Sequence, residues 1–96
     1  MKESTIEAAL RRAVIRYGGL ALKFVSPGMA GVPDRLLLFP GGRMACVEVK
    51  APGRKPRPLQ VYRMDQLRKL GFKVFVIDGR EQIESVLDAI RKPSLD

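Results

Sequence analysis

The sequence of 96 residues contains no histidine, no tryptophan and a single cysteine. Without an imidazole there is no base for a serine or cysteine triad or for a histidine-based nuclease, so these enzyme classes are excluded. The lone Cys46 cannot form an internal disulfide or supply a zinc cluster, and we interpret it as a packing residue of an apolar strand. Any catalysis must therefore use carboxylates and lysine.

Long hydrophobic runs are also missing. No apolar segment approaches the roughly 20 residues that cross a bilayer. The amino terminus MKESTIEAAL is acidic and periodic, whereas a secretory signal is basic and then apolar. We therefore expect a cytoplasmic protein that is not embedded in a membrane. The sequence indicates no protein partner other than a second copy of the chain.

Acidic residues are few. The chain has 10 Asp and Glu against 18 Lys and Arg, which gives a formal net charge of +8. Such a surface attracts a polyanion, most simply nucleic acid, with an anionic membrane surface as the weaker alternative. A hydrophobic fraction of 46% is ordinary for a globular protein, and the length predicts one domain over residues 1–96.

Hydrophobic periodicity and turn residues predict the order α-β-β-β-α-β-α. The expected helices cover residues 3–17, 59–70 and about 81–90, and the expected strands cover residues 20–25, 34–39, 44–50 and 73–77. Ser4 or Thr5 is the expected cap of the first helix. A helix separates the last two strands, so we expect them to be parallel and joined by a right-handed crossover. The fold class is α/β, with a mixed sheet flanked by helices.

The segments DRLLLF and MACVEVK flank PGGR, which is strong turn chemistry. If the turn centres on Gly41, opposed residues have numbers that add up to 82, and Asp34 faces Glu48. Side chains alternate along a strand, so Lys50 lies on the same face as Glu48. Three ionisable groups then converge, and repulsion and burial of the two carboxylates raise at least one pKa.

A divalent cation would neutralise such carboxylates, and oxygen ligands suit Mg²⁺. Lys50 beside it would orient or help to deprotonate the attacking water, or stabilise charge on a phosphate. The alternative is a structural ion pair between Lys50 and either Glu48 or Asp34 at the strand end.

Two helical residues extend this cluster. Glu7 borders the inward stripe of the first helix and would reach the carboxylates, although a surface pair with Arg11 is an equal alternative. Gln60 shares a helix face with Met64 and Leu67, which brings its amide towards Lys50 unless it is a solvated first-turn residue.

The segment GRKPR follows Lys50 and carries Arg54, Lys55 and Arg57. A basic loop at this position would contact a phosphate backbone at the reactive centre, although a charge run is often only a solvated face. We also expect Arg35, next to Asp34, to contact nucleic acid.

The elements GVPD (residues 31–34) and VEVK (residues 47–50), with Glu7 before them and Gln60 after them, resemble the VRR-NUC branch of the PD-(D/E)xK nuclease superfamily. The resemblance covers about residues 3–76. It implies a restriction-endonuclease-like αβββαβ core and a phosphodiesterase that depends on Mg²⁺ or Mn²⁺.

The resemblance also implies roles for individual residues. Asp34, Glu48 and the backbone carbonyl of Val49 would hold the metal, and Glu7 would assist through metal or water. Lys50 would be the catalytic lysine, and Gln60 would position Lys50 or a metal-bound water.

Stand-alone bacterial and phage members of the branch resemble homodimeric endonucleases that act on branched DNA such as Holliday junctions. A two-fold symmetric junction needs two opposed nicks, which suits a symmetric dimer. The first helix and the edge around LALKFV are candidate dimer surfaces. The alternatives are a non-catalytic basic nucleic-acid-binding module and a nicking or flap nuclease of broader specificity.

Overall fold

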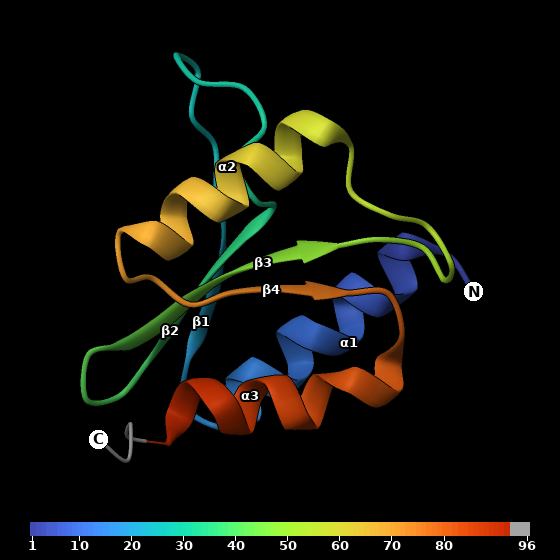
Figure 1. The fold of residues 1–96 in the computed structure, drawn as a ribbon. Coiled ribbons are helices and arrows are strands. Elements are labelled where there is room, and N and C mark those ends of the chain that lie inside the picture. Colours follow the sequence, from blue (N-terminus) through green and yellow to red (C-terminus); the bar gives the residue numbers. More distant parts are fainter. Residues whose placement is uncertain (93–96) are drawn as a thin grey trace.

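The fold was analysed in a computed structural model that describes residues 1–92 (Figure 1). Its elements are α1 (Glu3–Arg16), β1 (Leu20–Lys23), β2 (Arg35–Phe39), β3 (Arg43–Val49), α2 (Pro58–Lys69), β4 (Val74–Ile77), the 3-10 turn η1 (Arg80–Gln82) and α3 (Ile83–Arg91). The predicted order of helices and strands is confirmed.

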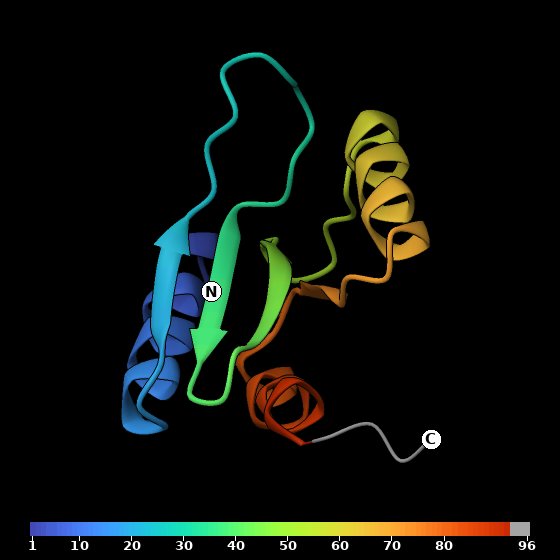
Figure 2. The same cartoon turned by 90° about the vertical axis from the view of Figure 1, so that its left-hand side faces the viewer.

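The four strands form one mixed sheet in the order β1-β2-β3-β4. Strands β1, β2 and β3 are antiparallel neighbours, whereas β4 runs parallel to β3. Helices α1 and α3 cover one face and α2 lies on the other (Figures 1 and 2). The predicted α/β class with a flanked mixed sheet is therefore confirmed, and so is the parallel pairing of the last two strands.

The register of the hairpin between β2 and β3 agrees with the prediction. Arg35 pairs with Val47 and Phe39 pairs with Arg43, so the numbers of paired residues add up to 82. Gly41 and Gly42 both have positive φ angles, +84° and +75°, which the turn requires and which glycine adopts without strain. Continuing this register by one residue places Asp34 opposite Glu48.

Alternation along β3 sends neighbouring side chains into different cores. Val47 and Val49 belong to the larger core with α1 and α3, whereas Cys46 packs with Met64 of α2. Burial raises the pKa of the Cys46 thiol, which agrees with a packing role. Glu48 has the parity of Cys46, so it lies on the α2 side of the sheet.

Some local expectations were wrong. The cap of α1 is Lys2, whose backbone is extended and whose carbonyl accepts from the Thr5 amide, so Ser4 and Thr5 lie inside the helix. Strand β1 ends at Lys23, although the Phe24 amide still donates to the Asp34 carbonyl. None of the helices in residues 1–92 combines the length and the apolar character that a membrane crossing needs.

The loop between β1 and β2 leads directly into Asp34 and rests on α2. The Arg63 Nε donates to the Ala30 carbonyl at 2.9 Å. Gly31 has a φ of +88°, and a Cβ built there would lie 2.8 Å from the Leu59 Cγ. The loop can therefore approach α2 this closely only with glycine at position 31.

We predict that Gly31→Ala destabilises the fold by about 1–3 kcal/mol, because a side chain at this φ is strained and also meets α2. The matched control is Gly28→Ala in the same loop, where an added Cβ meets nothing within 4 Å. Urea unfolding of both variants measures the difference, and equal stabilities would contradict the role given to Gly31.

Candidate active site

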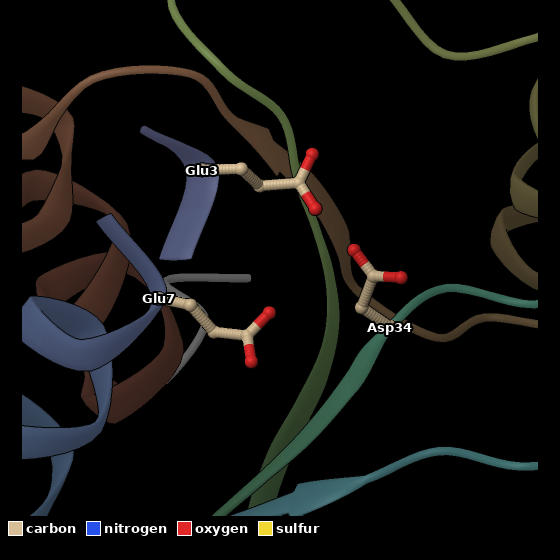
Figure 3. A group of neighbouring side chains, drawn as sticks. All are labelled: Glu3, Glu7 and Asp34. Carbon is tan, nitrogen blue, oxygen red and sulfur yellow. The ribbon is translucent and has the colours of Figure 1, made fainter. Parts of the chain in front are cut away.

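Three carboxylates meet where the first turns of α1 face the start of β2 (Figure 3). Glu3, Glu7 and Asp34 each offer one oxygen, and these oxygens all lie within 4.8 Å of one another. We call these three residues the acidic cluster. Glu7 and Asp34 were predicted from the sequence, whereas Glu3 was not. Its spacing of four residues from Glu7 on one helix face was the signal that could have found it.

The Asp34 side chain is fixed by the neighbouring strand. Its Oδ2 accepts a hydrogen bond from the Val49 amide at 3.0 Å. Because Asp34 lies just before β2, it contacts the end of β3 and also faces the two α1 carboxylates. It therefore joins the acidic cluster to the strand that carries Glu48 and Lys50.

Glu48 lies behind this cluster, with only 1% of its surface exposed. Its Oε2 accepts from the Lys50 Nζ at 3.1 Å and from the Gln60 Nε2 at 2.8 Å. Its Oε1 is buried and has no hydrogen-bond partner among the described residues. A buried carboxylate oxygen without a partner is costly unless a further donor or cation meets it.

The electrostatic environment raises the pKa of Glu48 above its ordinary value. Burial is the largest cause, the Lys50 ammonium opposes it, and the negative charge of Asp34 adds to it. The predicted rise in the pKa of one of the opposed carboxylates is therefore present, with desolvation as the dominant cause.

The ionisable side chains that were predicted to converge are divided between the two faces of the sheet. Glu48 and Lys50 pair on the α2 side, which is the ion pair considered as the structural alternative. Glu3 and Glu7 come from α1, on the opposite face of the sheet. Asp34, at the sheet edge, is the residue that approaches both groups.

Arg35 was expected to contact nucleic acid, but its side chain is only 10% exposed. Its Nη2 forms an ion pair with the Glu7 Oε1 across the edge of α1. Arg35 has the parity of the inward-facing Leu37, and this explains why it lies under α1. No Glu7–Arg11 pair occurs within residues 1–92. Arg35 therefore orients Glu7 and is not a surface contact.

Gln60 is buried in the first turn of α2, so it is not a solvated residue. Its Nε2 donates to Glu48, and its Oε1 accepts from the Arg57 amide at 2.8 Å. The Gln60 amide therefore lies at the strand end that carries Lys50, as its helix face predicted, and it contacts the Glu48 oxygen that also accepts from Lys50. The same side chain caps α2 and ties the preceding basic loop to the buried carboxylate.

The basic loop lies beside these groups, as its position after Lys50 predicted. Arg54, Lys55 and Arg57 line an open hollow of about 430 Å³ together with Lys50, Ala51 and Glu3. Glu3 therefore borders both the acidic cluster and the basic loop. The arrangement places cationic side chains within reach of anything bound at the carboxylates.

Comparison with known proteins identifies the fold and the family. A solved structure of a VRR-NUC domain superposes with a TM-score of 0.85 at 30% sequence identity, covering 92% of this chain and 96% of that one. The chain is also 46% identical over 90 residues to the "Putative nuclease p44" of Acyrthosiphon pisum secondary endosymbiont phage 1. The protein belongs to the VRR-NUC nuclease family. No protein-family model matches the sequence.

The similarity to these two proteins extends over nearly the whole chain. The phage relative aligns with 94% of this chain and 96% of its own length. The resemblance inferred from the GVPD and VEVK elements is confirmed at the level of family and fold.

The raised pKa of Glu48 predicts how stability depends on pH without added metal. The folded state favours the protonated form of Glu48. The contribution of Glu48 to the free energy of unfolding is therefore fully present below its unfolded pKa of about 4.3, and it is lost as pH rises through its pKa in the folded state. Glu48→Gln cannot titrate. We predict that the unfolding free energy of the wild type, relative to Glu48→Gln, falls as pH rises from about 4 to 7.

Urea unfolding in EDTA across this pH range measures that difference. A difference that stays constant, or that grows in favour of the wild type with rising pH, would contradict the assigned environment of Glu48.

Proposed function

We propose that this VRR-NUC protein is a metal-dependent DNA endonuclease that hydrolyses phosphodiester bonds, with branched DNA as its substrate class. The observation that carries the proposal is the acidic cluster, which Asp34 joins to the end of the strand that carries Glu48 and Lys50, in a chain of net charge +8. Because the proposed substrate is DNA, we place the enzyme inside the cell.

The residues at this edge fit a hard divalent cation. The three oxygens of the acidic cluster are close enough to share one ion, and the buried Glu48 Oε1 has no hydrogen-bond partner in residues 1–92. Among the four carboxylates, Glu7 pairs with Arg35 and Glu48 pairs with Lys50, whereas Glu3 and Asp34 form no ion pair within residues 1–92. Mg²⁺ and Mn²⁺ prefer such oxygen ligands.

We assign the metal to Asp34 and Glu7, as expected from the sequence, and add Glu3. Glu48 and the Val49 carbonyl remain proposed ligands on the strand side of Asp34. When bound, the ion would supply positive charge for the phosphate oxygens and acidify a water molecule.

Lys50 supplies the remaining cationic group of the site. Its ammonium is held at 3.1 Å from Glu48 Oε2 and is 17% exposed, so it is both fixed and accessible from the hollow of the basic loop. We propose that it stabilises the developing charge on the scissile phosphate or orients the attacking water. Gln60 acts as a positioning residue, because it holds the same oxygen of Glu48.

The first test is cleavage of a labelled four-way junction and a matched linear duplex in Mg²⁺, Mn²⁺ or EDTA. We expect symmetric, metal-dependent nicks in the junction and a loss of at least 100-fold in rate for Lys50→Ala, with DNA binding retained. Lys69→Ala, an exposed lysine at the end of α2, is the matched control.

Each other outcome has a defined meaning. Equal cutting of both DNAs would keep the nuclease and remove junction specificity, in favour of a nicking or flap enzyme. Binding without cleavage in either metal would identify a non-catalytic nucleic-acid-binding module, with Lys50 and Glu48 as a structural pair.

We also propose that the enzyme acts as a homodimer through the β1 edge. Leu20 and Leu22 are 59% and 43% exposed. Leu20 pairs with Leu38 and Leu22 pairs with Leu36 on the α2 side of the sheet. Figure 2 shows β1 at the edge of the sheet away from α2. A neighbouring apolar hollow of about 200 Å³ continues this surface. An uncovered edge strand with apolar side chains favours association.

Sedimentation velocity tests the dimer. We expect the wild type to sediment as a dimer and Leu22→Asp to shift towards the monomer by at least tenfold in dissociation constant. Val61→Asp, with a similar exposure of 42% on α2, should leave the dimer intact. A monomeric wild type, or equal effects of both variants, would overturn this assignment.

A further inference from the structure

A second group of basic side chains lies away from the basic loop, between α1 and η1. A hollow of about 150 Å³ is formed there over the small side chains of Ala9 and Ala13. Three arginines line it: Arg12, Arg16 and Arg80. We call this the arginine hollow. Its lining includes no residue of the acidic cluster or the basic loop, and it does not include Lys50.

The charge of the arginine hollow is not balanced. Glu84 is the acidic residue that lines it, and that carboxylate is held by Arg16 at 3.2 Å and by the Tyr17 hydroxyl. Arg12 and Arg80 form no ion pair within residues 1–92 and are exposed. Three guanidinium groups against one carboxylate leave a net charge of +2 around a space that fits a phosphate. Guanidinium groups bind phosphate oxygens through paired hydrogen bonds.

The arginine hollow lies next to the catalytic edge of the sheet. Strands β3 and β4 are parallel and end there together, since the Lys50 amide donates to the Ile77 carbonyl at 2.9 Å. Arg80 follows Ile77 by three residues and begins η1, which leads from the end of β4 into α3 (Figure 1). The Lys50 end of the sheet and the hollow therefore share one side of the molecule.

Helix α1 connects the acidic cluster to the arginine hollow. Glu3 and Glu7 in its first turns belong to the acidic cluster, whereas Arg12 and Arg16 further along the helix line the arginine hollow. Arg12 is five residues beyond Glu7, which corresponds to about 7.5 Å along the helix axis. The basic loop borders Glu3 at the other end of the acidic cluster. The acidic cluster thus lies between two cationic surfaces.

We propose that the arginine hollow binds a backbone phosphate of the DNA near the scissile bond, on the side opposite the basic loop. This inference rests on the proposed nuclease function and extends it. The loop and the hollow together would hold the backbone on both sides of the cut, which opposes the repulsion between the phosphates and the carboxylates.

The test is the salt dependence of DNA binding, measured by fluorescence anisotropy in EDTA so that no cleavage occurs. Each phosphate contact contributes about 0.9 to the slope of log affinity against log salt concentration. For Arg12→Ala combined with Arg80→Ala we expect the loss of one phosphate contact, so the slope should fall by about 0.9 and the affinity at 0.1 M salt should drop about tenfold. Both residues are exposed, so the melting temperature should not change.

The matched control is Arg43→Ala combined with Lys69→Ala, which removes the same charge at the opposite end of the sheet. Replacing Arg54, Lys55 and Arg57 with alanine provides a second comparison. This variant should also lower the slope of log affinity against log salt concentration, because it removes the phosphate contacts of the basic loop. Equal slopes for the arginine-hollow variant and the matched control would overturn the inference. If the wild type still cleaved DNA, the proposed nuclease function would stand. A wild type that neither binds nor cleaves DNA would overturn the nuclease itself.

Discussion

The repulsion between carboxylates that the fold brings together is the constraint on which the site depends. Asp34 is held by the Val49 amide while Glu3 and Glu7 face it from α1. Glu48 is buried behind them with a raised pKa, and one of its oxygens has no hydrogen-bond partner in the described part of the chain. A folded protein keeps such an arrangement only against an electrostatic cost, so the edge is suited to a cation that removes it.

The surrounding residues hold this arrangement in place from both faces of the sheet. Arg35 fixes Glu7 from below α1, and Gln60 fixes Glu48 from α2. Gly31 lets the loop before Asp34 rest against α2. Each contact joins a carboxylate, or the loop that carries it, to a different element, so the geometry of the site depends on the whole fold.

The hairpin illustrates what local sequence information can predict. The turn glycines and the alternation of β2 and β3 gave the correct register, because both signals lie within a few residues of each other. The same reasoning placed Glu48 with Lys50 and identified the family from the GVPD and VEVK elements. These features follow from spacing along one strand pair or one helix.

Features that depend on the packing of distant elements were not predictable in this way. The partner of Arg35 is set by where α1 crosses the sheet, and a surface role was wrongly expected for it. The contact of Gln60 with Glu48 depends on the depth at which α2 packs, which the helix pattern alone does not give. Glu3 shares a helix face with Glu7, but only the packing of α1 against the start of β2 shows that its carboxylate reaches Asp34.

The most direct test of the central claim measures cation binding at Asp34, the residue common to both sides of the site. We expect Mn²⁺ to raise the melting temperature of the wild type and of the exposed-carboxylate control Glu81→Gln, and to have no such effect on Asp34→Asn. A wild type that is indifferent to Mn²⁺, or an equal rise in Asp34→Asn, would contradict the account.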